Sequence, residues 1–205
     1  MTILSVNKTR EPMGAKRPFF VGWTRCVHFL FAKVILMDRK AKTMAHGAMI
    51  AALYVVLTYF QNMILPDSAT WAIQFRVSEA LCILAFFTPA AVPGLTLGCL
   101  LFNISYAGAL PLDYLVGSLA TFLATGGMWL SRRWTLRGVP LLGLLLPAVF
   151  NGLLVGWELA VYIGGGFWIN ALNVAIGEAA VLLTLGWLLY RVMKKNRLDV
   201  LMFGR

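Results

Sequence analysis

Long apolar runs separated by short polar stretches fill most of this chain. Four runs are clear, at residues 44–65, 112–130, 139–163 and 167–190. Each is close to the roughly 20 residues that an α-helix needs to cross a bilayer. The pattern therefore predicts an all-α integral membrane protein.

The stretch 69–110 admits two interpretations. It holds either one span at about 80–102 or two spans separated at residues 88–94, which read Thr-Pro-Ala-Ala-Val-Pro-Gly. Two prolines and a glycine favour a break, because proline lacks a backbone N–H and its ring clashes with the preceding helical turn. The local sequence therefore favours two spans.

The placement of basic residues decides between five and six spans. Of 18 Lys and Arg residues, nine precede the first run, three lie in residues 131–138 and five follow residue 190. Basic residues collect at the cytoplasmic ends of membrane spans. Six spans put all three clusters on the cytoplasmic side, whereas five would place two of them outside. We therefore predict a six-helix bundle with both termini cytoplasmic. The predicted helices are at about 44–65, 69–88, 90–108, 112–130, 139–163 and 167–190.

These boundaries divide the chain into three parts. A basic N-terminal segment (1–43) precedes the six-helix membrane domain (44–190), and a basic cytoplasmic tail (191–205) follows it. The N-terminal segment is not typical of a signal peptide, because basic residues interrupt its apolar stretch 19–36 and no small-residue cleavage site closes it. Two interpretations stay open. It is an amphipathic helix at the membrane surface, or translation starts later, at Met37 or Met44.

Composition agrees with a membrane protein and excludes other classes. The chain is 60% hydrophobic and 13% charged, against about 25% charged in soluble domains. The net charge of +10 follows from the span ends and does not indicate nucleic acid. Cys26, Cys82 and Cys99 lack metal-ligand spacing and lie in apolar surroundings, which favours packing. No P-loop, H-E-x-x-H or G-x-S-x-G motif occurs, so we expect neither an enzyme nor a metal site.

Polar side chains gather in the outer half of the predicted bundle. Ionisable groups inside a membrane are costly and usually mark a site. Asn151 and Glu158 are seven residues apart and share a helix face, and Glu178 lies near the middle of the last span. The candidate solute-binding residues are Trp71, Arg76, Glu79, Asn103, Asp113, Glu158, Trp168, Asn170 and Asn173.

Several of these residues have a structural alternative. Arg76 and Glu79, one helical turn apart, would also suit a structural ion pair. Asn151 and Asn173 would suit interhelical hydrogen bonds, Trp168 an interface anchor and Asp113 a helix N-terminus. Together, however, carboxylates, amides and aromatic rings suit a flat, polar solute that is rich in hydrogen-bond donors.

Small residues form a stripe on the first predicted span. Ala48 and Ala52 are four residues apart, with Gly47 and Ala51 beside them. Small residues at this spacing let two helix backbones approach closely in lipid. The stripe predicts either a contact within the bundle or a docking surface for a partner helix.

Five segments resemble the QueT family, whose members are substrate-binding S components of energy-coupling factor (ECF) transporters for queuosine precursors. The segments are Ala-Ala-Leu-Tyr-Val-Val-Leu-Thr (51–58), Ile-Gln-Phe-Arg-Val-Ser-Glu-Ala-Leu (73–81), Phe-Phe-Thr-Pro-Ala-Ala-Val-Pro-Gly (86–94), Gly-Ser-Leu-Ala-Thr (117–121) and Phe-Trp-Ile-Asn-Ala-Leu-Asn-Val-Ala-Ile-Gly-Glu (167–178). The resemblance covers about residues 44–190, and residues 1–36 lie outside it.

The resemblance implies a bacterial plasma-membrane importer subunit. Its fold is six helices with a solute pocket near the outer face, and its first-span motif, here Ala48 and Ala52, docks on a transmembrane coupling subunit. Two ABC-type ATPases use ATP to power the complex, so this chain itself needs no cofactor, and it topples in the membrane to release its solute. The expected solute is 7-aminomethyl-7-deazaguanine or a related deazapurine. A carboxylate such as Glu79 or Glu158 would bind the guanine N–H edge, a second would bind the ammonium, and a Trp would stack.

Two other functions are open at this point. The chain is an S component for a different vitamin-like solute, or it is a self-sufficient carrier or channel. No inverted repeat is visible, which counts against a self-sufficient carrier. An intramembrane enzyme is disfavoured because His28 and His46 both lie at the predicted cytoplasmic end, away from the polar cluster.

Overall fold

The computed structural model describes residues 39–66, 75–135 and 140–203. Two compact units divide the chain, Met1–Lys42 and Thr43–Arg205. Of the first unit the structure describes residues 39–42, which form the first turn of α2. Most of the predicted segment 1–43, and Trp71, therefore lie outside the described residues.

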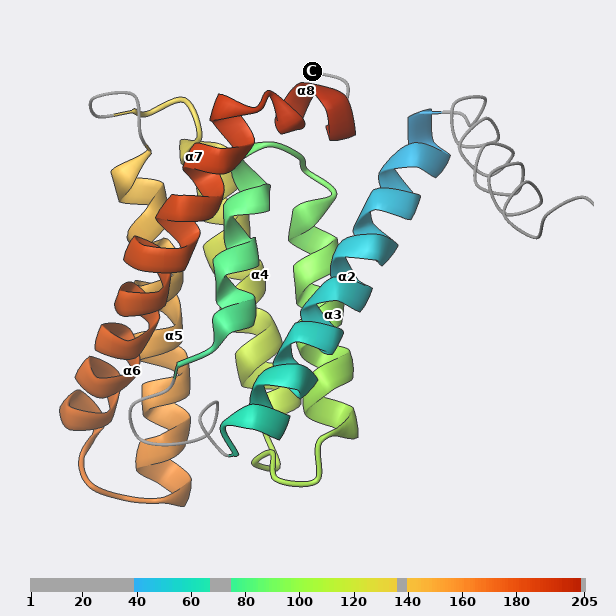
Figure 1. Cartoon of the computed structure of the whole chain (residues 1–205). Helices are drawn as coiled ribbons and strands as arrows, with labels where there is room; N and C mark the ends of the chain where they lie inside the picture. The colour runs from blue at the N-terminus through green and yellow to red at the C-terminus, as the bar shows by residue number, and fades with distance from the viewer. Residues whose placement is uncertain (1–38, 67–74, 136–139, 204–205) are drawn as a thin grey trace, which may run out of the picture. The chain divides into compact units, whose positions relative to one another are not determined.

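The described part of the second unit is built from helices. In chain order they are α2 (Arg39–Ile64), η1 (Val77–Phe86), α3 (Ala91–Ser105), α4 (Asp113–Ser131), α5 (Leu141–Tyr162), α6 (Phe167–Val181), η2 (Leu182–Gly186), α7 (Trp187–Lys195) and α8 (Leu198–Phe203). Helices α3, α4, α5 and α6 pack against one another in sequence order (Figure 1).

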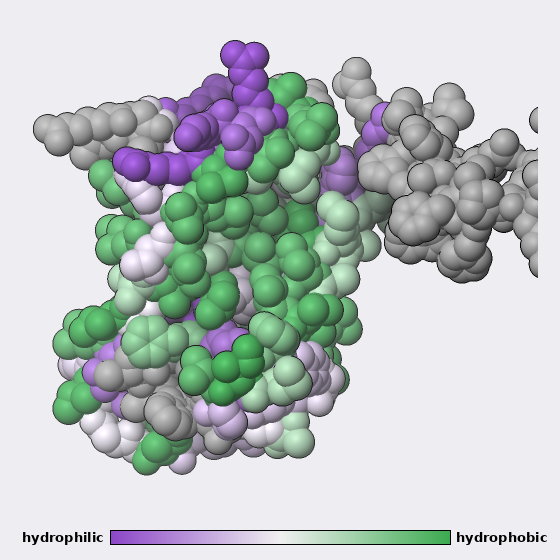
Figure 2. Space-filling model, viewed as in Figure 1, coloured by the Kyte–Doolittle hydropathy of each residue, from purple (hydrophilic) through white to green (hydrophobic). Residues whose placement is uncertain are grey.

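The helices confirm the prediction of a membrane helical bundle. Three are long and apolar enough to cross a bilayer, at Lys40–Ile64, Leu141–Tyr162 and Phe167–Lys195, and Val77–Phe86 and Ala91–Ser105 are shorter apolar helices. Apolar side chains cover much of the surface between the two ends of the bundle (Figure 2). The count of six crossings and the cytoplasmic side of the termini stay predictions.

The second predicted helix, 69–88, differs from the structure. The described part is η1, a 3₁₀-helix over Val77–Phe86, and Arg76 before it is extended (φ −99°, ψ 100°). Ten residues at about 2 Å each cover about 20 Å, less than the roughly 30 Å hydrocarbon core. Every residue from Ser78 to Phe86 is buried.

Helix η1 forms the centre of the bundle. It contacts α3, α4, α5, α6, η2 and α7, and it is the green segment in the middle of Figure 1. Its sequence is apolar nearly all round, which is typical of a helix surrounded by other helices. The predicted break at residues 88–94 is confirmed, because α3 begins at Ala91.

Glycines bring the backbones of α5 and α6 into contact. A Cβ added at Gly156 would lie 2.5 Å from the Cα of Ala171, and one at Gly152 would lie 2.9 Å from the carbonyl oxygen of Ala171. Gly152 and Gly156 form a G-x-x-x-G pair, which permits close helix contact in lipid. Helices α2 and α3 meet in the same way, because a Cβ at Gly94 would lie 2.6 Å from the oxygen of Gly47.

We expect Gly156→Ala to lower the free energy of unfolding by about 1–3 kcal/mol, the usual cost of overpacking. The obstructing atoms are backbone atoms of Ala171, which cannot rotate away. Thermal unfolding in detergent measures the effect. Gly126→Ala is the matched control, because nothing lies within 4 Å of a Cβ at that position and alanine favours helix. Equal melting temperatures for the two variants would contradict the close α5–α6 contact.

Candidate functional site

Four carboxylates are buried inside the bundle. Glu79, Asp113, Glu158 and Glu178 are 0%, 4%, 0% and 1% exposed, and they come from η1, α4, α5 and α6. Within the described ranges, Arg76 is the one buried Lys or Arg, at 4% exposure. Burial of charge is costly unless it is compensated, and four carboxylates outnumber one guanidinium. The interior therefore has an excess of acceptors for a cation or for N–H donors.

Arg76 lies between the carboxylates. Its guanidinium interacts electrostatically with Asp113 and Glu79, and also with Glu158 and Glu178. Its Nη1 lies 3.9 Å from the position that a Cβ of Gly117 would occupy. The extended backbone before η1 thus places one cation in reach of all four helices that carry carboxylates.

Neutral donors hold Glu79 in place. The hydroxyl of Tyr54 donates to Oε1 at 2.7 Å, and the thiol of Cys82 donates to Oε2 at 3.0 Å. One turn along α2, the hydroxyl of Thr58 donates to Oγ of Ser78 at 2.8 Å. Both oxygens of Glu79 are therefore occupied, and this carboxylate ties α2 to the central helix.

Asp113 and Asn103 organise the connection between α3 and α4. Oδ2 of Asp113 accepts the backbone N–H of Leu110 at 2.8 Å, and Nδ2 of Asn103 donates to the carbonyl of Asp113 at 2.8 Å. A Cβ at Gly117 would lie 2.9 Å from Nδ2 of Asn103, so the glycine leaves room for this amide. Asp113 is the first residue of α4, as the alternative reading of a helix N-terminus predicted, and it also interacts electrostatically with Glu158.

Glu158 and its neighbours carry unpartnered polar atoms. Among the described residues, both oxygens of Glu158, Oε2 of Glu178 and Nδ2 of Asn151 are buried without a hydrogen-bond partner. Buried polar groups are nearly always paired, because leaving one unpaired costs about 1–3 kcal/mol and more for a charge. Glu158 lies close to Asp113, and Glu178 lies close to Asn151. These four side chains are therefore the candidates for contact with a ligand.

Glu178 and Asn151 were not among the predicted binding residues. Glu178 is about 80° around the helix from the Asn170–Asn173 stripe at 100° per residue. Asn151 was equally well explained by an interhelical hydrogen bond. The seven-residue spacing of Asn151 and Glu158 was the sequence feature that could have placed Asn151 in the site, because it puts both residues on one helix face. The structure places Asn151 beside Glu178, across the α5–α6 contact.

The remaining predicted residues lie elsewhere. Trp168 is 70% exposed and packs edge-on against Phe167, in agreement with the interface-anchor alternative. Nδ2 of Asn170 donates to the carbonyl of Gly164 at 2.8 Å and so holds a loop of three glycines with φ near +85° to +88°, a conformation that favours glycine. Asn173 is half-buried on α6. The structure thus brings together Arg76, Glu79, Asn103, Asp113 and Glu158, and it leaves Trp168 outside the group.

The small-residue stripe of α2 has two faces. Gly47 and Ala51 are buried, whereas Ala48 and Ala52 are exposed. Beside Ala48 a hollow of about 340 Å³ is lined by Thr43, Met44, Gly47, Ala48, Pro93, Gly94 and Leu97. The two predictions for this stripe therefore divide between its faces: the buried pair packs within the bundle, and the exposed pair is accessible to a partner.

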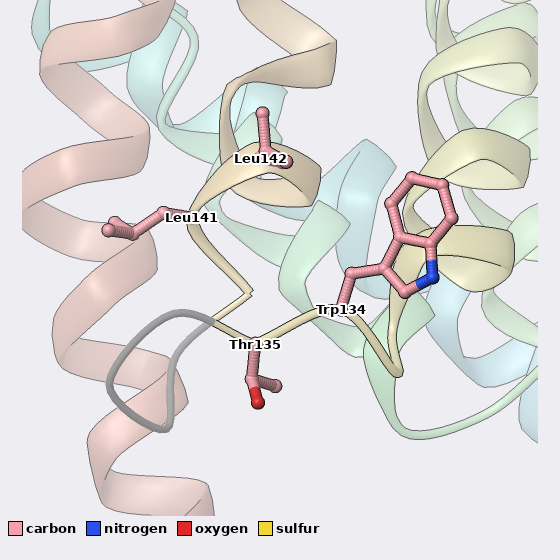
Figure 3. Close-up of a pocket in the computed structure, with 4 residues that line it drawn as sticks. All are labelled: Trp134, Thr135, Leu141 and Leu142. Atoms are coloured by element: carbon pink, nitrogen blue, oxygen red, sulfur yellow. The ribbon is translucent and has the colours of Figure 1, made fainter.

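A second hollow, of about 240 Å³, lies where α4 ends and α5 begins. It is lined by Trp134, Thr135, Leu141 and Leu142, whose side chains point in different directions instead of converging (Figure 3). None of the described residues that line it is charged. This end of the bundle is opposite the α3–α4 and α5–α6 connections (Figure 1), so the hollow is separate from the buried carboxylates.

Sequence comparison identifies relatives of this chain. Residues 44–195 match the model of the QueT transporter family. A similar protein is the queuosine precursor transporter QueT of Lactococcus lactis subsp. cremoris (strain MG1363), which is 39% identical over 88 residues, 42% of this chain and 49% of that protein. The matched segment thus spans about half of that relative's length. No solved structure matches the chain.

Proposed function

This chain belongs to the QueT transporter family, and from that premise we propose that it is the substrate-binding S component of an ECF-type importer. The family is one of transporters, which confirms that the chain is a membrane transport protein and not an enzyme. In the proposal, the chain resides in the bacterial plasma membrane and binds a queuosine precursor from outside the cell.

The observation that carries the proposal is the unpartnered Glu158 within an acidic interior. Both of its oxygens are buried without a partner among the described residues, and three further carboxylates are buried with it. A solute that brings a positive charge and several N–H donors would compensate this arrangement. 7-Aminomethyl-7-deazaguanine has an ammonium group and the N–H donors of a guanine edge. The Lactococcus lactis relative is named for transport of queuosine precursors.

Charge placement supports the proposed orientation. The end of the bundle that carries α7 and α8 has exposed basic residues, among them Lys194 and Lys195, and it is strongly hydrophilic (Figure 2). Arg132 and Arg133 follow α4 at the same end (Figure 1). By the positive-inside tendency this end faces the cytoplasm. Asp113 and Glu158, near the opposite end, would then face the outside, where the solute is captured.

In the proposal the chain does not act alone. A transmembrane coupling subunit binds at the exposed Ala48 and Ala52, and two ABC-type ATPases drive release of the solute into the cell. Close approach of a partner helix requires small exposed side chains, which these two alanines supply. A self-sufficient carrier would instead transport solute in liposomes that contain no other protein.

Binding of 7-aminomethyl-7-deazaguanine to the detergent-purified chain tests the proposal. We expect a dissociation constant in the nanomolar range, on the order of −12 kcal/mol of binding free energy, by isothermal titration. Riboflavin is expected not to bind, and guanine to bind more weakly because it lacks the ammonium group. Absence of binding by protein that unfolds cooperatively would reject the assigned solute.

A further inference from the structure

We propose that the buried polar groups form two subsites that recognise opposite ends of the solute: Asp113 and Glu158 bind a cationic ammonium, and Glu178 with Asn151 binds a ring edge that presents an N–H beside a carbonyl. The inference rests on the proposed function, since it assumes that a polar solute binds inside this bundle. It goes further by assigning chemistry to each end and by adding Glu178 and Asn151 to the site.

The first subsite is defined by two neighbouring carboxylates. Glu158 is fully buried, and neither of its oxygens makes a hydrogen bond of regular geometry in the described part of the chain. Its carboxyl group lies close enough to that of Asp113 to interact with it by charge and by hydrogen bonding. Oδ2 of Asp113 already accepts the N–H of Leu110. Two adjacent carboxylates repel one another when both are ionised, and a neutral ligand would not relieve this repulsion. An ammonium group has three donors and one positive charge, and it can serve both carboxylates at once.

The second subsite pairs one acceptor with one donor. Oε2 of Glu178 and Nδ2 of Asn151 are both buried and make no hydrogen bond of regular geometry among the described residues. The two side chains lie close enough to interact with one another, so a ligand here would replace their mutual contact. A ring edge with adjacent N–H and C=O groups is complementary: the N–H donates to the carboxylate, and the carbonyl accepts from the amide. Glu79 lies nearby, but Tyr54 and Cys82 already occupy its oxygens.

The two subsites have a fixed separation. Asn151 and Glu158 are two turns apart on one face of α5, which corresponds to about 10 Å along the helix axis. Arg76 interacts electrostatically with both Glu158 and Glu178, so it lies within range of both ends. A bicyclic ring with a short cationic arm suits this arrangement, because the ring edge and the arm reach different carboxylates.

The test compares three ligands with matched variants. The ligands are 7-aminomethyl-7-deazaguanine, its 7-cyano analogue, which keeps the ring but has no ammonium, and guanine. The wild-type chain is expected to bind the cyano compound at least tenfold more weakly than the aminomethyl compound. Glu158→Gln should weaken binding of the aminomethyl compound at least tenfold and change binding of the other two less than threefold. Glu178→Gln and Asn151→Leu should weaken all three at least fivefold.

A control variant tests whether any buried polar change has the same effect. Thr125→Val removes a buried hydroxyl that already donates to the carbonyl of Thr121 in its own helix, and it should leave all three affinities unchanged. For the ammonium subsite the readout is the pattern across ligands, because a merely structural defect would weaken all of them together. For the ring-edge subsite the readout is the contrast with Thr125→Val, at an unchanged melting temperature of the Glu178→Gln and Asn151→Leu variants.

The possible outcomes separate a failure of the two-subsite assignment from a failure of the proposed function. If none of the three ligands binds the wild-type chain, the proposed function fails. If they bind but Glu158→Gln weakens all three equally, or Glu178→Gln weakens none, the two-subsite assignment is overturned. Should a variant not fold, equal wild-type affinity for the aminomethyl and cyano compounds alone overturns the ammonium subsite.

Discussion

Uptake of the solute is expected to be lost in the double variant Ala48→Trp with Ala52→Trp, although solute binding is retained. Both alanines are exposed on α2, so two indoles would project outward and leave the buried carboxylates undisturbed. They would hold a partner helix away from a surface that small side chains make accessible. Uptake of labelled solute by cells that contain the coupling subunits, together with titration of the purified variant, measures the two properties separately.

A matched control separates docking from a general effect of surface tryptophan. Ala180 is exposed on α6, and Ala180→Trp should leave both binding and uptake near their wild-type values. Normal uptake by the double variant would show that the Ala48–Ala52 face is not the docking surface. Loss of binding in the double variant would instead mean that the substitutions disturb the bundle.

Glu79→Gln is expected both to weaken solute binding at least tenfold and to lower the melting temperature. The carboxylate accepts from Tyr54 and from Cys82, whereas an amide offers one acceptor and adds two donors. Either the hydroxyl of Tyr54 or the thiol of Cys82 would then lose its acceptor inside the bundle, which costs about 1–3 kcal/mol. Since η1 forms the centre of the bundle and carries Glu79, a displaced η1 would also displace Arg76. A tenfold loss of affinity corresponds to about 1.4 kcal/mol.

A double-mutant cycle with Tyr54→Phe tests this explanation. The variant Tyr54→Phe removes the hydroxyl that donates to Oε1 of Glu79. In that background Glu79→Gln should lower the melting temperature less than it does in the wild-type chain, because one conflicting donor is gone. Additive effects of the two substitutions would exclude the Tyr54–Glu79 hydrogen bond as the cause.

Substitution of Glu158 is expected to affect binding but not stability, unlike substitution of Glu79. Neither oxygen of Glu158 makes a hydrogen bond of regular geometry among the described residues, so Glu158→Gln is expected to weaken binding at least tenfold without lowering the melting temperature. The two carboxylates looked equivalent as charged residues in apolar spans. In the structure Glu79 holds helices together through its two hydrogen bonds, whereas the oxygens of Glu158 are available to a ligand.

The sequence by itself determined the class of protein, the approximate positions of the helices and the family. Apolar runs, basic clusters and a proline-rich break are patterns along one dimension, and lipid and membrane charge act on them directly. The break before α3 and the buried positions of Arg76, Glu79, Asn103, Asp113 and Glu158 agree with those predictions.

The tertiary structure decided what depends on neighbours from distant parts of the chain. Surrounding helices bury η1 as a short 3₁₀ segment where the sequence alone predicted a longer helix. Rotation of α2 divides its small residues into a buried pair and an exposed pair, and Trp168 points outward. Whether a buried carboxylate is occupied, as Glu79 is, or open, as Glu158 is, depends on which donors other helices bring within about 3 Å. That distance is a property of packing in three dimensions, so no residue spacing along the chain encodes it.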